Sequence, residues 1–269
     1  MYDCVIGSSG GKDSHAIVLK ALELGLRPLV VTATPEWPTE IGRRNVESVK
    51  RLGVDTIEFT ADPVVRRKVM RIGLLEVGDI EWGEHCLIWG IPVRIAQAFG
   101  IRVVLYGEQP QNEYSFGREG AQQAIRLDRR WREEFGGLIG LRPADLVGRD
   151  GITTEQMWPY EWPLDSAITS FGLWLGQFFE WHGLRNALIA QSHGFEWYAD
   201  MVEGSLGGFE NLDNAVVGLH DRLMFLKFGF GRASAIASTL VRRGIISRDD
   251  ALGIVARHDG RYPSTYLGV

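Results

Sequence analysis

The sequence predicts an α/β protein with a doubly wound, mostly parallel sheet and an α-rich C-terminal region. Two observations support this fold class: short apolar runs alternate with helical patterns from the first residues onward, and the alternation ends near residue 107. Strands that alternate with helices are joined by right-handed crossovers, which give a parallel sheet with helices on both faces. Ligands of such sheets bind at the carboxyl ends of the strands, so we expect the functional site there.

Four segments have the composition of buried strands, because each is a short run rich in apolar and β-branched residues. They are residues 2–7, 28–34, 55–60 and 102–106. Helical patterns fill the intervals, with apolar side chains at the spacing of one helix face. They cover residues 14–24, 41–52, 63–75 and 86–99.

The chain changes character after the fourth predicted strand. Residues 109–120 are predicted as a polar loop and residues 121–135 as a charged helix. Residues 136–163 are rich in glycine and proline, and residues 165–260 are predicted as helices with aromatic connections. We therefore expect an α/β domain over residues 1–120 and an α-rich substrate-binding region over residues 121–269.

Composition excludes several classes of protein. The 269 residues are 45% hydrophobic and carry a net charge of −5, which argues against nucleic acid or an anionic membrane as a partner. Cys4 and Cys86 are too few for a four-cysteine zinc site or a disulfide framework. No apolar run is long enough for a membrane span, and Asp3 argues against a signal peptide, so we expect a cytoplasmic protein.

The strongest local signal is residues 8–14 (SSGGKDS), which lie directly between the first predicted strand and the first predicted helix. Two glycines let the backbone turn tightly toward an anion, and the helix N-terminus adds the positive end of its dipole. The segment is not a Walker A loop, because Ile6 and Asp13 stand where that motif needs glycine and Ser or Thr. A plain glycine turn with Ser14 as the helix cap is the weaker alternative. The sequence thus predicts a phosphate-binding loop.

Residues 9–14 match in full the S-G-G-x-D-S signature, and the chain here resembles the PP-loop ATP pyrophosphatases. The resemblance implies that ATP is cleaved between its α and β phosphates, so that a substrate is adenylated and pyrophosphate is released. It implies that ATP is bound by the loop and, through the backbone, by the end of the second strand: Ser8, Ser9, Gly10, Gly11, Lys12, Asp13, Ser14, Val31, Thr32 and Ala33. For catalysis it implies that Asp13 lies near Mg²⁺ or orders the loop. Lys12 occupies the variable position and either binds phosphate or is solvated.

Further segments narrow the resemblance and extend it over nearly the whole chain. They are 40–45 (EIGRRN), 53–59 (GVDTIEF), 65–68 (VRRK), 77–80 (VGDI), 91–96 (IPVRIA), 106–114 (YGEQPQNEY), 170–176 (SFGLWLG), 220–221 (HD), 226–232 (LKFGFGR) and 258–263 (HDGRYP). They are similar to the N-acetyl sugar amidotransferases of surface-polysaccharide (LPS and O-antigen) biosynthesis. This implies that the acetamido group of a nucleotide-linked sugar becomes an acetamidino group, with ATP, Mg²⁺ and ammonia from a separate glutaminase subunit.

The loop after the fourth strand carries three further candidates. Glu108 stands at the carboxyl end of that strand, where we expect it to hold Mg²⁺ with Asp13 or to orient ammonia, unless it only caps the loop. Glu113 and Tyr114 follow on the same loop as candidates for substrate binding, although a structural role for Glu113 is equally compatible with the sequence.

A second pair of candidates comes from the C-terminal region. Lys227 and Arg232 flank residues 228–231 (FGFG), in which two glycines would cost stability in an ordinary helix. Such glycines suggest a close approach to a ligand, so we expect the two cations to reach the phosphates of the nucleotide sugar.

Two departures from the family pattern concern the N-terminus and the sugar pocket. Family members commonly carry a cysteine-bearing segment ahead of the loop, and we expect that module to be absent because the loop starts within the first ten residues. Residues 115–117 (SFG) stand where the family usually has two glycines, which predicts a reshaped pocket.

Two other functions stay open from the sequence. The first is adenylation of another acceptor, as in thiolation or amidation of tRNA or a base, for which Cys86 would act as a sulfur carrier rather than as a core residue. The second is a regulatory nucleotide-binding subunit without chemistry.

His85, preceded by Glu84, is either an acid–base group or a structural histidine. Four arginines over residues 126–132 are interpreted as a solvated helix face.

Overall fold

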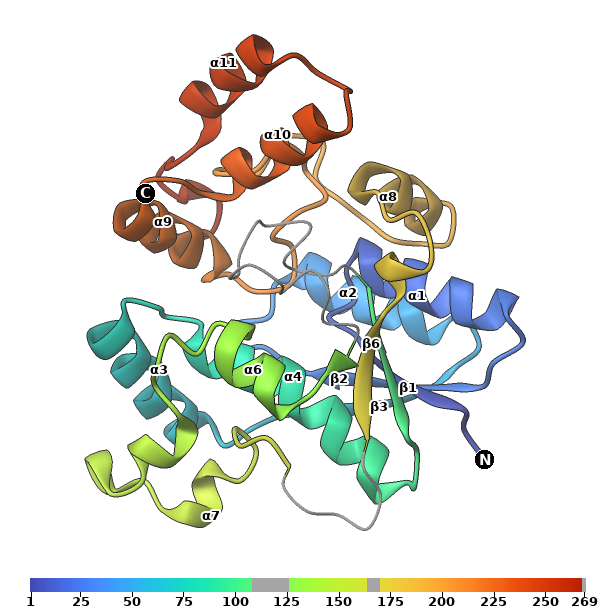
Figure 1. Ribbon diagram of the computed structural model, residues 1–269, viewed down its shortest axis with the longest axis vertical. Helices are drawn as coiled ribbons and strands as arrows, with labels where there is room; N and C mark the ends of the chain where they lie inside the picture. Colours follow the sequence, from blue (N-terminus) through green and yellow to red (C-terminus); the bar gives the residue numbers. More distant parts are fainter. Residues whose placement is uncertain (108–125, 164–169, 268–269) are drawn as a thin grey trace.

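A computed structural model describes residues 1–107, 126–163 and 170–267 (Figure 1). These residues form a six-stranded sheet in the order β3-β2-β1-β4-β6-β5. The strands are β1 (Cys4–Gly7), β2 (Pro28–Ala33), β3 (Asp55–Phe59), β4 (Val103–Tyr106), β5 (Arg126–Leu127) and β6 (Phe171–Trp174). All neighbours are parallel except β5, which pairs antiparallel with β6. The four predicted strands are confirmed, and so is the doubly wound α/β fold class.

Alternating side chains of the central strands bury both faces of the sheet. Ile6 and Val30 pack with α1 (Lys12–Glu23) and α2 (Glu40–Lys50) on one face. Val5 and Val31 pack with α3 (Pro63–Val77) and α4 (Trp82–Ala98) on the other face. Successive residues of a strand point to opposite faces, which explains why these strands are continuously apolar. Figure 1 shows the helices distributed over the two faces in this way.

Local caps set the beginnings and ends of the helices around the sheet. The Thr39 hydroxyl accepts from the Gly42 N–H at 2.9 Å and begins α2. The Asp62 carboxylate accepts from the Val64 N–H at 2.8 Å and begins α3, with Pro63 in the first turn. Gly78 ends α3 in the left-handed region, with φ at 64°. This turn directs the chain into α4 across the next three residues.

The strand β6 corrects the prediction that residues 165–260 are helices and connections. It pairs in parallel with β4, with Val103 opposite Phe171 and Tyr106 opposite Trp174. Gly172 is required there, because a Cβ would lie 2.8 Å from the Leu127 Cβ and 3.0 Å from the Tyr106 ring. A four-residue strand that contains glycine gives a weak local signal, so its place depends on pairing with β4. The sheet thus extends past residue 120, the predicted boundary.

The charged helix predicted over residues 121–135 begins later than expected. In the structure α6 covers Arg129–Phe135, because the Asp128 side chain accepts from the Trp131 N–H at 2.9 Å and caps the helix there. Residues 121–125 lie outside the described part of the chain. Arg129 and Arg130 pair with Glu133 and Glu134 one turn on, as expected of a solvated face. Arg132 instead is buried and donates to the Tyr160 carbonyl.

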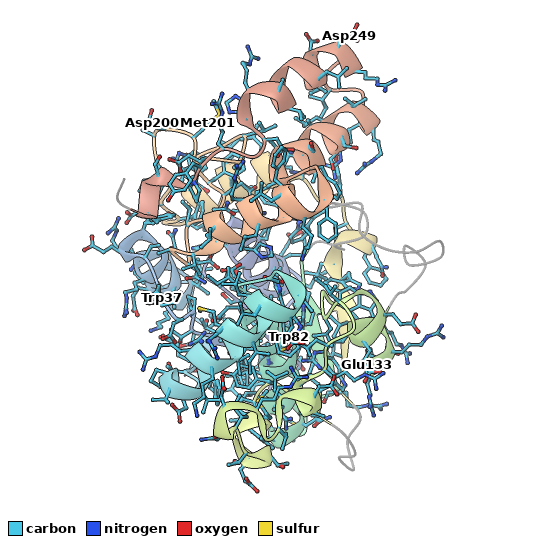
Figure 2. All side chains as sticks on the ribbon, turned by 90° about the vertical axis from the view of Figure 1, so that its left-hand side faces the viewer. Trp37, Trp82, Glu133, Asp200, Met201 and Asp249 are labelled. Atoms are coloured by element: carbon cyan, nitrogen blue, oxygen red, sulfur yellow. The ribbon has the colours of Figure 1, made fainter. Side chains whose placement is uncertain are left out.

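The remaining helices follow α6 in the chain. They are α7 (Thr154–Met157), α8 (Gly183–Gln191), α9 (Val217–Phe228), α10 (Arg232–Arg242), α11 (Arg248–His258) and α12 (Ser264–Leu267), with short 3₁₀ turns at Pro143–Leu146, Arg149–Gly151 and Leu175–Gln177. Figure 1 shows α9, α10 and α11 at one end of the molecule, and α8 lies on α1. Figure 2 shows Trp82 in the packed interior and Asp249 at the outer end of α11. No helix in the described part of the chain has both the length and the apolar character needed to cross a membrane.

Candidate functional site

The loop between β1 and α1 has the geometry of an anion cradle. Gly10 has φ at 82°, and a Cβ there would lie 2.7 Å from the Val46 backbone nitrogen. The Ser9 N–H donates to the Ser14 hydroxyl, and the Gly10 N–H donates to the Ser8 hydroxyl, both at 3.1 Å. Gly11 is the N-cap and offers no side chain to the first turn of α1, whose N–H groups have no partner within the helix. The loop thus presents backbone donors at a helix N-terminus.

A cavity of about 340 Å³ opens in front of this loop. Its wall contains residues 7–14 and residues from the carboxyl ends of β2, β4 and β6, namely Val31, Ala33, Tyr106 and Trp174. The prediction that the site lies at the carboxyl ends of the strands is therefore consistent with the position of the cavity. Of the three residues predicted to lie along adenine, Val31 and Ala33 face the cavity, whereas the buried Thr32 side chain is not part of its wall.

Lys12 and Asp13 are held by partners from the C-terminal half of the chain. The Lys12 ammonium lies 2.8 Å from the Asp13 carboxylate and 3.0 Å from the Glu210 carboxylate. The Asn186 amide donates to the other oxygen of Asp13 at 2.9 Å. Both oxygens of Asp13 thus have partners, which fits a carboxylate that orders the loop; direct binding of Mg²⁺ would require it to release Lys12. Lys12 is largely buried and paired, not solvated.

The two predicted C-terminal cations have different positions. Arg232 lines the cavity, and its guanidinium contacts Asp221 through two hydrogen bonds, of 2.7 and 3.1 Å. Burial acts to raise the pKa of Asp221, but the guanidinium outweighs it and holds that pKa below its ordinary range. Lys227 is not part of the cavity wall, since its ammonium donates to the Val77 carbonyl at 2.8 Å, at the end of α3. Only Arg232 of this pair faces the cavity.

Residues 209–214 form a wall of the cavity that the sequence does not reveal. They run from Phe209 to Asn214 between α8 and α9 and face the loop of residues 8–14. Backbone hydrogen bonds dock them on the start of α2, from Thr39 N–H to the Asp213 carbonyl and from Ala215 N–H to the Trp37 carbonyl. The available signal is a run of polar Glu, Asn and Asp residues without helical period, which by itself predicts only a loop.

Three ionisable residues at the start of α4 complete the wall. The Asn214 amide donates to Glu81 at 2.7 Å, and burial raises the pKa of Glu81 to about 7. The Glu84 carboxylate makes two hydrogen bonds with buried Arg66, of 2.8 and 2.6 Å. His85 also faces the cavity, and its acid–base and structural interpretations both stay predictions.

Aromatic rings from α4, β4 and β6 line part of the cavity. Trp89, Tyr106 and Trp174 belong to its wall, and the Trp89 ring lies 5.1 Å from Tyr106 and 5.5 Å from Trp174 between centroids. Tyr106 donates its hydroxyl hydrogen bond to the Trp89 carbonyl at 3.2 Å. The cavity thus joins a polar, charged end to a rigid apolar end.

The remaining candidates are a buried cysteine and three residues of the loop after β4. Cys86 is fully buried on α4, and burial raises the pKa of its thiol to about 12. A thiol of this kind is a poor nucleophile, which favours the core interpretation. Glu108, Glu113 and Tyr114 lie outside the described residues, so their roles stay predictions.

Comparison with known proteins agrees with one part of the expected resemblance. Residues 194–268 match the family model described as the C-terminal domain of WbpG-like LPS biosynthesis proteins. The resemblance to proteins of surface-polysaccharide biosynthesis is thereby confirmed for this region. No curated protein sequence matches the chain.

Two solved structures align with part of this chain. NMN synthetase from Francisella tularensis is 17% identical, with 42% of this chain aligned to 48% of that one and a TM-score of 0.35. A predicted subunit of tRNA methyltransferase from Methanocaldococcus jannaschii is 18% identical, with 46% of this chain aligned to 63% of that one and a TM-score of 0.31. The chain covers less than two thirds of the length of either structure.

Proposed function

We propose that this protein is an ATP-dependent, AMP-forming amidotransferase that acts on a nucleotide-linked N-acetyl sugar. One observation carries the proposal: the S-G-G-x-D-S loop and the region matched to LPS biosynthesis proteins line the same cavity. Glu210, Asn211, Asp213, Asn214 and Arg232 all lie within residues 194–268 and in the wall opposite the loop. A nucleotide cradle and a polysaccharide-type substrate region would then serve one reaction.

The loop end of the cavity suits the triphosphate of ATP. Backbone N–H groups of residues 11–14, with the Ser9 and Ser14 hydroxyls, would hold the β and γ phosphates at the N-terminus of α1. Lys12 and Arg232 would add positive charge next to them. Val31 and Ala33 would lie along the adenine. The Mg²⁺ that accompanies ATP would neutralise charge on the leaving pyrophosphate. Asp13 and Glu108, whose role is predicted from the sequence, would be the carboxylates that bind this ion.

The chemistry of the acceptor requires activation of an amide. The amide oxygen attacks the α phosphate, the bond between the α and β phosphates breaks, and pyrophosphate leaves. Ammonia then adds to the carbon of the O-adenylated imidate, loses a proton, and expels AMP, which carries the former amide oxygen. The acetamido group becomes an acetamidino group. Positioning and stabilisation of phosphate charge would supply most of the catalysis.

The apolar end of the cavity suits the acetamido group and its sugar. Trp89, Tyr106 and Trp174 would form an apolar wall beside the sugar and would help keep water from the imidate. We infer that ammonia comes from a separate glutaminase subunit, as the family resemblance implies.

Isotope tracing gives the most direct test. The enzyme is incubated with ATP, Mg²⁺, an ammonium salt and a panel of nucleotide-linked N-acetyl sugars labelled with oxygen-18 in the acetamido group. The expected products are pyrophosphate, AMP that carries the label, and a sugar in which NH has replaced the amide oxygen. Unlabelled AMP without a changed sugar would mean that the enzyme adenylates an acceptor other than the sugar. The next candidates would be tRNA and bases. Formation of ADP, or no turnover with any acceptor, would contradict the proposal.

Variants of the loop control for contaminating activity. Ser9→Ala and Asp13→Ala should lower turnover by at least about tenfold, because Ser9→Ala removes the hydroxyl proposed to hold phosphate and Asp13→Ala removes the carboxylate that Lys12 and Asn186 contact. Ser192→Ala changes an exposed hydroxyl at the C-terminal end of α8, outside the cavity wall, and should leave turnover unchanged.

A further inference from the structure

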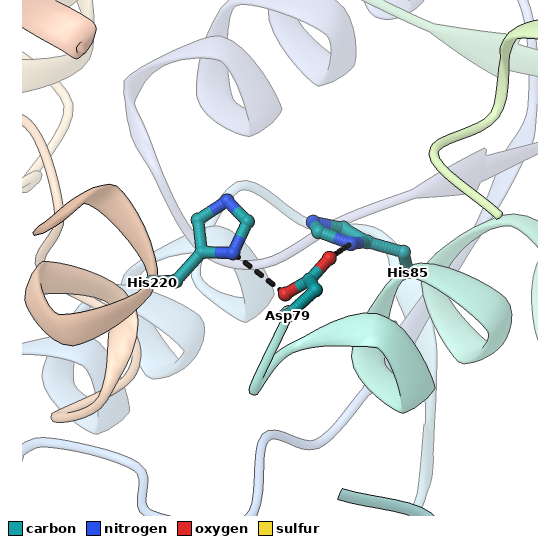
Figure 3. Close-up of side chains that lie close together, drawn as sticks. All are labelled: Asp79, His85 and His220. Atoms are coloured by element: carbon teal, nitrogen blue, oxygen red, sulfur yellow. Dashed lines mark hydrogen bonds and ion pairs between the residues drawn. The ribbon is translucent and has the colours of Figure 1, made fainter. Parts of the chain in front are cut away.

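Asp79, His85 and His220 bring three potential metal ligands to one point (Figure 3). The His220 Nδ1 lies 2.8 Å from one oxygen of Asp79, and the His85 Nδ1 lies 3.3 Å from the other. One ligand atom from each of the three residues falls within 4.8 Å of the others. Figure 3 shows the two imidazole rings on either side of the carboxylate, which comes from the turn between α3 and α4.

The three residues come from separate elements that the fold holds rigidly. Asp79 follows Gly78, the left-handed residue that ends α3, and its carboxylate is almost fully buried. His85 lies in the first turn of α4, and His220 lies in the first turn of α9, more than a hundred residues later. An arrangement of this kind orients ligands from several directions around a common point, as metal sites require.

We propose that Asp79, His85 and His220 form a three-ligand site for a first-row divalent metal ion of the zinc type. Two imidazole nitrogens and one carboxylate are a ligand set typical of zinc and of other first-row metals, whereas Mg²⁺ prefers oxygen ligands only. Ligands around a tetrahedral ion with bonds of about 2.0–2.1 Å lie roughly 3.3 Å apart. The two histidine nitrogens lie 2.8 and 3.3 Å from the two oxygens of Asp79, which is close to this separation.

The surroundings of the cluster support a metal ion. The buried Nδ1 of His85 makes no hydrogen bond within the described part of the chain, although it points toward Asp79 (Figure 3). Its 3.3 Å contact with Asp79 lacks the geometry of a hydrogen bond, and an ion between the rings would give this nitrogen a direct ligand bond. The Glu81 N–H donates to the Asp79 carboxylate at 2.8 Å and fixes its orientation, as partners of metal ligands commonly do.

The position of the site gives it access to the candidate active site. His85 and Glu81 are both part of the cavity wall, so the cluster lies at the edge of the cavity that faces the loop of residues 8–14. A three-ligand site leaves a position for water or a substrate oxygen. The inference does not depend on amidotransfer, because metal binding is measured here without ATP, sugar or ammonia.

Metal binding to the full chain tests the site directly. The protein is dialysed against a chelator, and Zn²⁺ is titrated with a competing chromophoric chelator, with the bound metal counted by elemental analysis. We expect about one ion per chain that excess Mg²⁺ does not displace. His85→Ala and His220→Ala should each weaken binding by more than about 100-fold, since loss of a partner outside the ligand shell already costs 10–100-fold. His193→Ala, which changes an exposed histidine elsewhere, should bind as the wild type does.

A spectroscopic measurement separates a site at this cluster from adventitious binding. Co²⁺ in place of Zn²⁺ should give the visible d–d absorption of four-coordinate cobalt with nitrogen and oxygen ligands, and His220→Asn should lose it while keeping the circular dichroism of the folded chain. Failure of the wild type to bind Zn²⁺ or Co²⁺ would overturn the proposal. Binding that persists unchanged in the two histidine variants would overturn it equally, because the ion would then lie elsewhere.

Discussion

The carboxylate of Glu210 lies 3.0 Å from the ammonium of Lys12. This ion pair joins the loop before α1 to the segment between α8 and α9, and both side chains are shielded from solvent. The other oxygen of Glu210 lies 4.0 Å from the Arg232 guanidinium. One carboxylate therefore offsets positive charge on two cations of the cavity, and this charge becomes available to an anionic ligand when the carboxylate is removed.

Glu210→Gln should strengthen the binding of ATP. The amide keeps the size of the side chain but removes a negative charge next to the loop, so the local potential becomes more favourable to phosphate. We expect the apparent affinity for ATP to rise by about 3- to 10-fold, which corresponds to roughly 0.7–1.4 kcal/mol. Equilibrium binding of a non-hydrolysable ATP analogue measures this change.

A matched variant distinguishes a local effect from a change in net charge. Glu196→Gln removes a half-exposed carboxylate that pairs with Arg44, away from the cavity wall. Its affinity for the analogue should equal that of the wild type. Weaker binding by Glu210→Gln would show that the carboxylate holds Lys12 in its binding position and would refute the electrostatic argument.

The hydrogen bond from Asn186 to Asp13 should stabilise the loop. Asn186→Asp places a second carboxylate against Asp13 at the 2.9 Å contact, and we expect a loss of about 1–3 kcal/mol in the free energy of unfolding. The double variant Asn186→Asp with Asp13→Asn restores one donor and one acceptor and should recover part of this loss. Chemical denaturation of the wild type, Asn186→Asp, Asp13→Asn and the double variant gives the coupling energy between the two side chains. Strictly additive effects on the free energy of unfolding would mean that the two side chains do not interact.

Part of this site follows from sequence because its signals are local. The loop of residues 8–14 needs only the order strand, two glycines and helix, and the hydrogen bonds within it, from Ser9 to Ser14 and from Gly10 to Ser8, join residues at most five positions apart. The strands β1 to β4 are likewise recognisable, because burial on both faces makes them continuously apolar. Boundaries differ by one or two residues, as at β1, which begins at Cys4 rather than Tyr2.

The rest of the site depends on contacts between distant segments. β6 becomes a strand because the free edge of β4 pairs with Phe171–Trp174, and nothing within those four residues requires it. Glu210 reaches Lys12 only after residues 212–215 dock on the start of α2. Asp79 and His220 are 141 positions apart, so no spacing rule joins them. Each of these contacts is a product of tertiary packing.

Gly10→Ala tests the backbone of the loop. Gly10 combines a φ of 82° with a space in which a Cβ would lie 2.7 Å from the Val46 nitrogen. Gly53 has a similar φ of 85°, and nothing lies within 4 Å of its Cβ position. Gly53→Ala should thus cost only the strain of a left-handed residue, about 1–2 kcal/mol. Gly10→Ala should cost roughly 1–3 kcal/mol more and should also lose binding of the ATP analogue.

Thermal and denaturant unfolding of the two alanine variants provide the comparison. Equal losses in the two variants would mean that Val46 moves away at little cost and that only φ matters. Retention of full analogue affinity by Gly10→Ala would contradict the assignment of this turn to phosphate binding.

Cys86→Ala separates amidotransfer from sulfur transfer. The side chain is fully buried in the core on α4, so its truncation should cost about 1 kcal/mol of stability. Turnover per folded molecule should stay within about twofold of the wild type, because no step of the proposed reaction uses the thiol. A folded Cys86→Ala protein without turnover would instead favour the thiolation alternative.

His15 should make the stability of the loop depend on pH. The imidazole is fully buried on α1, with Nδ1 3.0 Å from the Gly11 carbonyl and Nε2 2.8 Å from the Ser48 hydroxyl. The carbonyl can only accept, so Nδ1 carries the hydrogen and Nε2 accepts from Ser48 in the neutral form. Burial lowers the pKa of His15 below its ordinary value, because the charged form would be desolvated.

The sign of the effect follows from proton uptake. The unfolded chain takes up a proton at this histidine near pH 6.5, whereas the folded chain does so only at lower pH. The contribution of His15 to stability is therefore complete above about pH 6.5 and falls as the pH drops below that value, by at most about 1.4 kcal/mol per pH unit. Denaturant unfolding at a series of pH values should show this slope in the wild type and lose it in His15→Gln. A constant difference between the two proteins across that range would mean that His15 does not resist protonation.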